Sequence, residues 1–278
     1  MTSNRHKLRL DQLLHRQKPE LSRSRIQSEI MAGRVLVDGS VCDKPGTMVS
    51  EKAEIKLLEP DNPYVSRGGL KLGKALQDLS IDVKNLVVLD VGASTGGFTD
   101  CLLQKGAQLV YALDVGYGQL DYSLRHNPSV VVMERFNIRN LKPDHLPVLP
   151  DLAVVDVSFI SLTKVLPVLY RLEIPRVLAL IKPQFEVGRA DAGRGRGVIR
   201  DPALHARVLT SLVEAACEGG YCCQGITFSN YPGPKGNIEY FISYTIRKTG
   251  KHSCRENFEK AVLKIVEEAH IILAKDKK

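Results

Sequence analysis

VVLDVGASTGGFTD, from Val87 to Asp100, is the stretch that decides the fold of this 278-residue chain. Aliphatic residues surround Asp90, which is typical of a strand buried on both faces of a parallel sheet. Glycines at positions 92, 96 and 97 then let the backbone turn tightly and approach a ligand closely. A second aliphatic run ends at Asp114, where nucleotide-binding α/β folds place an acid against ribose hydroxyls. The pattern predicts a site for an adenosine-containing cofactor; the alternative is a plain α/β turn without a ligand.

The composition of this loop distinguishes between cofactors. The dinucleotide fingerprint G-x-G-x-x-G needs its second glycine to make room for a pyrophosphate, and Ser94 occupies that position here. The carboxylate of Asp90 would repel a pyrophosphate, whereas it suits a cationic or zwitterionic group. S-adenosylmethionine carries an amino acid and a sulfonium and has no phosphate. The loop therefore favours S-adenosylmethionine over NAD, and we expect Asp90, Gly92, Ser94 and Gly97 to help hold it.

Strands and helices alternate around the loop. The expected strands are Leu86–Asp90, Leu109–Val115, Ser129–Arg135, Asp151–Val157 and Arg176–Lys182, and the helices between them begin near Gly96, Gln119 and Ser161. Such alternation predicts a parallel sheet with helices on both faces.

The end of the chain departs from this alternation. A helix begins at Asp201-Pro202 and ends at Gly219-Gly220. Strands Gln224–Phe228 and Glu239–Arg247 follow, joined by a loop too short for a crossover helix, so the last strand is expected to be antiparallel. An amphipathic helix, Arg255–Leu273, closes the chain. The predicted fold class is α/β: a doubly wound, mostly parallel seven-stranded sheet, the architecture of class I methyltransferases.

Residues 1–58 form a separate, small α+β module. RLDQLLHR and SRSRIQSEIMAG predict two helices, RVLVDGSVC predicts a hairpin, and AEIKLLE predicts a strand. The first 35 residues hold eight basic against three acidic side chains. This order of elements resembles the α-L RNA-binding domain of ribosomal small-subunit protein four. We expect Arg9, Arg23, Arg25 and Arg34 to bind RNA phosphates.

Residues 59–69 (EPDNPYVSRGG) predict a linker, and residues 70–278 the methyltransferase domain, which opens with a helix over 70–79. The whole chain has a net charge of +8, which would attract a polyanion. Six cysteines form no C-x-x-C pair and no Cys/His cluster at zinc spacing, so we expect no metal site. The chain has neither an apolar signal core nor an apolar run of the ~20 residues that span a bilayer. We therefore expect a soluble, cytoplasmic protein without a membrane partner.

Four polar residues fall where strand ends and loops should converge: Lys71, Asp156, Lys182 and Glu239. Ligands of open α/β sheets bind outside the carboxyl ends of the parallel strands, so Asp156 and Lys182 share the rim of the glycine loop. Less specific interpretations remain for each of them. Asp156 could cap a helix, Lys182 and Lys71 could be solvated surface lysines, and Glu239 could be an exposed acid at a strand edge.

These motifs together resemble the TlyA/haemolysin A family of ribosomal RNA ribose 2′-O-methyltransferases. The matching segments are RLDQLL, SRSRIQ, VSRGGLKL, LDVGASTGGFTD, ALDVG, VVDVSFISL, IKPQFEVG and GNIEYF. The resemblance implies a catalytic tetrad of Lys71, Asp156, Lys182 and Glu239. It also implies that Gly96, Phe98, Asp114 and Asp156 line the S-adenosylmethionine site. Asn137 stands where related ribose methyltransferases often carry an acid toward the adenine.

The reaction implied is the transfer of a methyl group to a ribose 2′-hydroxyl of ribosomal RNA, free or in a ribosomal subunit. Lys182 would act as the base if neutral or stabilise the developing alkoxide if charged. The loop GRADAGRGRGVIRD adds Arg194 and Arg196 as candidate phosphate ligands. Other functions stay open: a non-catalytic RNA-binding or ribosome assembly factor, a membrane-active haemolysin, or an NAD-dependent oxidoreductase. The sequence identifies neither the modified nucleotide nor the oligomeric state.

Overall fold

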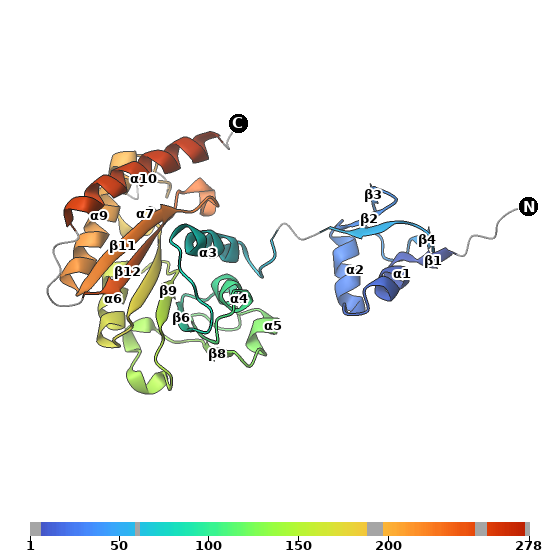
Figure 1. Cartoon of the computed structure of the whole chain (residues 1–278), viewed down its shortest axis with the longest axis horizontal. Coiled ribbons are helices and arrows are strands. Elements are labelled where there is room, and N and C mark those ends of the chain that lie inside the picture. Colours follow the sequence, from blue (N-terminus) through green and yellow to red (C-terminus); the bar gives the residue numbers. More distant parts are fainter. Residues whose placement is uncertain (1–6, 59–61, 188–196, 248–254, 276–278) are drawn as a thin grey trace, which may run out of the picture. The chain divides into compact units, whose positions relative to one another are not determined.

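The computed structural model describes residues 7–58, 62–187, 197–247 and 255–275. The chain divides into two compact units, Met1–Pro63 and Tyr64–Lys278. Figure 1 shows the two units, and each has its own apolar core.

The first unit packs two helices on short strands. Its elements are β1 (Lys7–Arg9), α1 (Leu10–Gln17), α2 (Arg23–Met31), β2 (Val35–Val37), β3 (Ser40–Val41), β4 (Met48–Ser50) and β5 (Ile55–Leu57). The strand β2 pairs antiparallel with both β3 and β5, and β1 pairs antiparallel with β4. The predicted helices and the Asp38-Gly39 hairpin are confirmed, with Ser22 as the cap of α2. Arg9, expected within the first helix, instead ends β1 and precedes α1.

The second unit contains the expected seven-stranded sheet. Its strands are β6 (Val87–Val91), β7 (Leu109–Leu113), β8 (Val130–Met133), β9 (Leu152–Val155), β10 (Arg176–Ile181), β11 (Tyr221–Phe228) and β12 (Tyr240–Ile246). Their order across the sheet is β11-β12-β10-β9-β6-β7-β8. The five strands from β6 to β10 run parallel, and β12 runs antiparallel to its neighbours β10 and β11. The predicted fold class is therefore confirmed.

Helices cover both faces of this sheet (Figure 1). The cluster that contains α3 (Arg67–Asp78) and α4 (Gly97–Gln104) packs on one face. The cluster that contains α6 (Leu162–Arg171), α9 (Pro202–Glu218) and α10 (Arg255–Lys275) packs on the other. Two short helices, α5 (Tyr122–Arg125) and α7 (Pro183–Glu186), follow strand ends.

The helix α3 begins three residues earlier than predicted and lies partly within the expected linker. Ser66 caps it by accepting a hydrogen bond from the Gly68 backbone N–H. The segment SRGG, with its two glycines, favoured a linker, but a serine cap is sufficient to start a helix there. Arg67 therefore belongs to the first turn of α3.

The strand β6 is buried on both faces, and its side chains alternate between the two helix layers. Val87, Leu89 and Val91 belong to the core beneath α6, α9 and α10. Val88 belongs to the core beneath α3 and α4, and Asp90 has the same parity as Val88. Asp90 accordingly points toward α4, where its Oδ2 accepts a hydrogen bond from Thr99 Oγ1 at 2.7 Å.

Asp90 is fully buried, and its Oδ1 has no hydrogen-bond partner among the described residues. Burial raises the pKa of Asp90 to about 7, whereas the Thr99 hydrogen bond opposes the shift and Asp156 adds to it. A carboxyl group in an unfolded chain titrates near 3.8. Between these two pH values the folded protein holds a proton that the unfolded chain has lost, so Asp90 destabilises the fold increasingly as the pH rises.

We expect Asp90→Asn to remove this pH dependence, because the amide fits the same space and does not ionise. The variant should match the wild type near pH 4. It should become more stable than the wild type by on the order of 3 kcal/mol near pH 8. Chemical denaturation at both pH values measures the difference, with the exposed Asp144→Asn as the control. Parallel stability curves for Asp90→Asn and the wild type would show that Asp90 is already ionised in the folded protein.

Candidate active site

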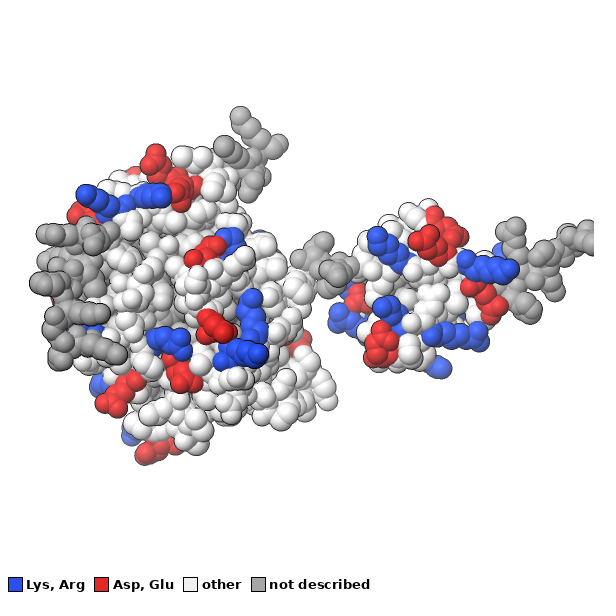
Figure 2. All heavy atoms as spheres, viewed as in Figure 1, with Lys and Arg blue, Asp and Glu red and all other residues white. Residues whose placement is uncertain are grey.

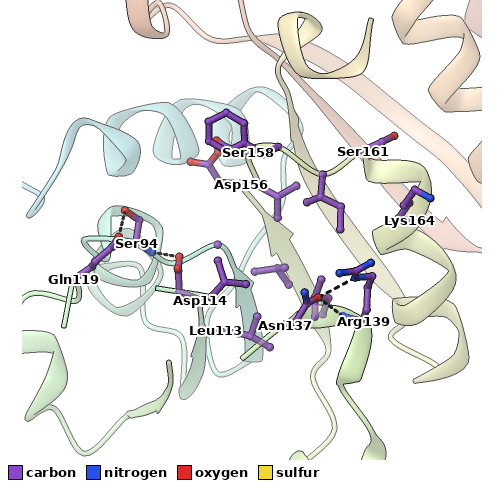
Figure 3. A pocket seen from close by; sticks show the side chains of 17 residues that line it. Ser94, Leu113, Asp114, Gln119, Asn137, Arg139, Asp156, Ser158, Ser161 and Lys164 are labelled. Carbon is purple, nitrogen blue, oxygen red and sulfur yellow. Dashed lines mark hydrogen bonds between the residues drawn. The ribbon is translucent and has the colours of Figure 1, made fainter. Parts of the chain in front are cut away.

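A cavity of about 730 Å³ lies beyond the carboxyl ends of the parallel strands β6, β7 and β9 (Figure 3). Its walls come from the glycine loop, the segments after β7 and β9, and the turn that follows β8. The lining residues predicted from the sequence are Gly92, Ser94, Asp114, Asn137 and Asp156. The volume lies within the usual range for a small-molecule site.

The glycine loop packs closely against the segment that follows β9. Gly92 has a φ of +92°, and a Cβ atom there would overlap the carbonyl oxygen of Asp156. This close approach brings the loop after β6 against the segment after β9, so both face one cavity. The pairing of Val91 with Val155 sets the same register.

Asp114 follows β7 and is held by the backbone. Its Oδ2 accepts a hydrogen bond from the Ser94 N–H at 2.8 Å, and its Oδ1 accepts one from the Gly116 N–H at 2.7 Å. Each carboxylate oxygen retains a further lone pair for a ligand hydroxyl. Asn137 lines the same cavity, and its Oδ1 accepts hydrogen bonds from the backbone N–H and the Nε of Arg139. Figure 3 shows Asp114 and Asn137 on the same cavity.

Four of the predicted cofactor residues do not line the cavity. Asp90 points toward α4, and Phe98 packs in the core against Phe241, with ring centroids 6.1 Å apart. Gly96 and Gly97 shape the start of α4 instead. A Cβ atom at 96 would overlap Leu124, and one at 97 would overlap the side chain of Ser66.

The structure brings the four predicted catalytic residues into two ion pairs. Lys182 Nζ lies 2.5 Å from Asp156 Oδ1, and Lys71 Nζ lies 2.6 Å from Glu239 Oε2. Lys182 also donates to Ser158 Oγ at 3.2 Å. All four side chains are largely buried, and the Glu239 side chain has no exposure. The pairs compensate each buried charge, which an isolated charge would not tolerate.

Each pair is placed by the ends of secondary-structure elements. Asp156 follows β9, Lys182 follows β10, and Glu239 immediately precedes β12. Lys71 lies in the second turn of α3. Burial raises the pKa of Glu239 above its usual value, while the charge of Lys71 opposes that rise. Asp156 belongs to both an ion pair and the cavity wall, so it connects the two parts of the site.

A second, smaller cavity of about 480 Å³ lies beside Lys71. Its lining includes three cations, Arg67, Lys71 and Lys235, together with Pro232, Gly233 and Gly236. No acidic side chain is among these described lining residues. Arg67 and Lys235 were not predicted as site residues, although Arg67 lies within the segment VSRGGLKL and Lys235 directly precedes GNIEYF. The exposed Phe159 on the rim of the larger cavity was also missed.

The arginines of the first unit that were predicted to bind RNA differ in exposure and in their ion pairs. Arg23 is exposed at the start of α2. Arg9 pairs with Asp11 at 2.8 Å, and both Arg25 and Arg34 pair with the buried Glu29. On the face seen in Figure 2, basic and acidic side chains are interspersed over this unit. Arg194 and Arg196 lie outside the described residues.

Within the described residues, no group of three His, Cys, Asp or Glu side chains is arranged to hold a metal ion. None of the described helices is both long enough and apolar enough to cross a membrane.

The chain matches known proteins over both units. Residues 64–245 match the model of the FtsJ-like methyltransferase family, and residues 8–55 match the S4 domain. The 16S/23S rRNA (cytidine-2′-O)-methyltransferase TlyA of Mycobacterium tuberculosis is 44% identical over 89% of this chain and 94% of its own length. Hemolysin A of Brachyspira hyodysenteriae is 41% identical over 86% of this chain and 100% of its own length.

A solved structure of a hemolysin-named protein from Streptococcus thermophilus is similar to this chain, with a TM-score of 0.73 and 38% identity. The match covers 98% of this chain and 99% of that one. The resemblance to the TlyA/haemolysin A family is confirmed: this chain belongs to the FtsJ-like methyltransferase family and carries an S4 domain ahead of its methyltransferase domain.

Proposed function

We propose that this protein transfers a methyl group from S-adenosylmethionine to a ribose 2′-hydroxyl of ribosomal RNA. One observation carries the proposal: Asp156 lines the large cavity and pairs with Lys182, which connects a cofactor-sized site to two buried lysine–acid pairs. The M. tuberculosis relative is named for the same reaction on the cytidine ribose of ribosomal RNA.

The donor groups of the large cavity fit S-adenosylmethionine. The carboxylate of Asp114 is suited to a pair of ribose hydroxyls, and that of Asp156 to an ammonium or a sulfonium. Asn137 would face the adenine, and the backbone at Gly92 and Ser94 would adjoin the methionine part. Bound there, the cofactor supplies an electrophilic methyl group. Arg139 and Lys164 also line the cavity, and Arg139 lies beside Asn137 (Figure 3).

The small cationic cavity fits the acceptor. Arg67, Lys71 and Lys235 would hold an RNA phosphate next to the ribose, and the exposed ring of Phe159 would stack on a base. The 2′ oxygen would then face the Asp156–Lys182 pair. When this oxygen takes the methyl group supplied by the cofactor, whose sulfur would leave as the neutral thioether, the Asp156–Lys182 pair would accept the hydroxyl proton. Lys182 stabilises the negative charge that develops on the oxygen, and the Lys71–Glu239 pair orients the ribose.

The S4 domain would add affinity for RNA through Arg23 and the paired Arg9, Arg25 and Arg34. Because Glu29 anchors two of these guanidinium groups, they keep a defined orientation toward a phosphate. The domain division proposed is an RNA-binding domain over residues 1–58, a linker, and a methyltransferase domain that begins with α3.

We expect Lys182→Ala to reduce kcat about 10²- to 10⁴-fold. In this variant the developing alkoxide lacks a stabilising cation, and the 2′-hydroxyl proton lacks the Asp156–Lys182 pair that would accept it. Binding of S-adenosylmethionine should persist, since the cavity walls at Asp114 and Asn137 are unchanged. Transfer of tritiated methyl groups to purified ribosomal subunits gives the rate, and calorimetry gives the affinity. The exposed Lys84→Ala is the control. Full turnover by Lys182→Ala would exclude Lys182 from the mechanism, and absence of transfer by the wild type would favour a non-catalytic assembly factor.

We expect Arg67→Ala and Lys235→Ala each to raise the KM for RNA and to leave the affinity for S-adenosylmethionine unchanged. Each lost phosphate contact should reduce the slope of log affinity against log salt by about 1. RNA binding measured at several salt concentrations tests this, again with Lys84→Ala for comparison. An unchanged slope and an unchanged KM would show that the small cavity does not bind the RNA phosphate.

A further inference from the structure

The loop between β11 and β12, residues 229–239, carries both Lys235 and Glu239. Backbone hydrogen bonds close it: the Ser229 N–H donates to the Glu239 carbonyl at 2.8 Å, and the Gly233 N–H donates to the Asn237 carbonyl at 2.9 Å. The backbone at Gly233 lies directly on the Glu239 side chain, because a Cβ atom there would overlap its carboxylate. A displacement of this loop would therefore displace the Glu239 carboxylate.

The side chain of Asn237 fastens this loop to another part of the chain. Asn237 is buried, with 4% exposure. Its Nδ2 donates to the Gly197 carbonyl at 3.0 Å, and its Oδ1 accepts from the Ile199 N–H at 3.1 Å. Because one neighbour is an acceptor and the other a donor, the orientation of the amide is fixed. Both polar ends of the side chain thus hold residues 197–199.

Ile199 is also connected to Tyr240, the residue after Glu239, through the side chain of His205. His205 is buried, and its Nε2 donates to the Ile199 carbonyl at 3.2 Å, so its Nδ1 is the acceptor nitrogen of a neutral ring. That nitrogen lies 2.8 Å from the Tyr240 hydroxyl and 3.2 Å from His270 Nε2. Burial lowers the pKa of His205 to about 4, so the neutral ring persists at neutral pH. Glu239 therefore lies between Asn237, which binds residues 197–199 directly, and Tyr240, which reaches Ile199 through His205.

We propose that Asn237 is a positioning residue for methyl transfer: its amide holds the 229–239 loop so that Glu239 meets Lys71 and Lys235 faces the small cavity. The inference rests on the proposed function, because it assigns the loop to the acceptor side of that site. Asn237 contacts residues 197 and 199 and acts on the reaction only through Glu239 and Lys235.

The experiment compares Asn237→Ala with the full-length wild type. Without the amide, kcat should fall tenfold or more, since displacements of about 1 Å at a site can cost about 10²-fold. The affinity for S-adenosylmethionine should stay the same. The Lys71 pairing should weaken, so the acid limb of the pH–rate profile should move to higher pH. A ¹³C NMR titration of the Glu239 carboxyl, made without RNA or cofactor, should show its midpoint moving in the same direction.

Two further variants separate positioning from general destabilisation. Asn237→Asp, once protonated, can both donate to Gly197 and accept from Ile199, so its activity relative to the wild type should rise as the pH falls. Tyr221→Phe removes another buried hydrogen bond to a backbone carbonyl, that of Ile174. Tyr221 is the first residue of β11, at the end of the strand away from the 229–239 loop. The Tyr221→Phe variant should leave kcat and the pH profile unchanged.

An unchanged Glu239 titration in Asn237→Ala, or a loss of activity that only follows the folded fraction, would overturn the inference. Failure of the proposed function is distinct from this result, because it appears as absence of transfer by the wild type. The NMR titration tests the positioning in that case as well.

Discussion

The ion pair between Lys71 and Glu239 is the interaction on which the arrangement of the site depends. Lys71 places a positive charge beside the buried Glu239 carboxylate, across a separation of 168 positions in sequence, and so offsets part of the cost of burying it. The pair joins α3, which covers one face of the sheet, to the start of β12. Once these two elements are fixed, the small cationic cavity and the Asp156–Lys182 pair lie beside the carboxyl ends of the parallel strands.

The parallel part of the sheet could be predicted from the sequence, because β6 to β10 are buried on both faces and appear as continuous aliphatic runs. Each of these strands ends within two residues of its predicted bounds. The short strands β1 and β4 were missed, since three residues carry too little alternation to be recognised. The rim residues Asp156 and Lys182 could be predicted because strand ends in such sheets converge.

The remaining site residues depend on contacts that sequence patterns do not encode. Arg67 and Lys235 line one cavity because α3 and the 229–239 loop meet in the fold, far apart in sequence. Asp90 was expected at the cofactor because it precedes the glycines. Alternation along β6 instead directs it toward Thr99 of α4, a position that the parity of Val88 and Asp90 could have indicated. Similarly, Phe98 is an apolar residue whose helix turns it into the core.

The position of β12 between β10 and β11 bears on how the protein is made. A ribosome delivers residues 64–181 early, and the parallel part of the sheet can assemble from them, but β10 then has an unpaired edge. Glu239 and β12, the strand that covers this edge, come later in the chain than β6 to β10. A growing polypeptide thus lacks the Lys71–Glu239 pair until its sheet is closed. Under the proposed function, chains that lack β12 would not transfer methyl groups.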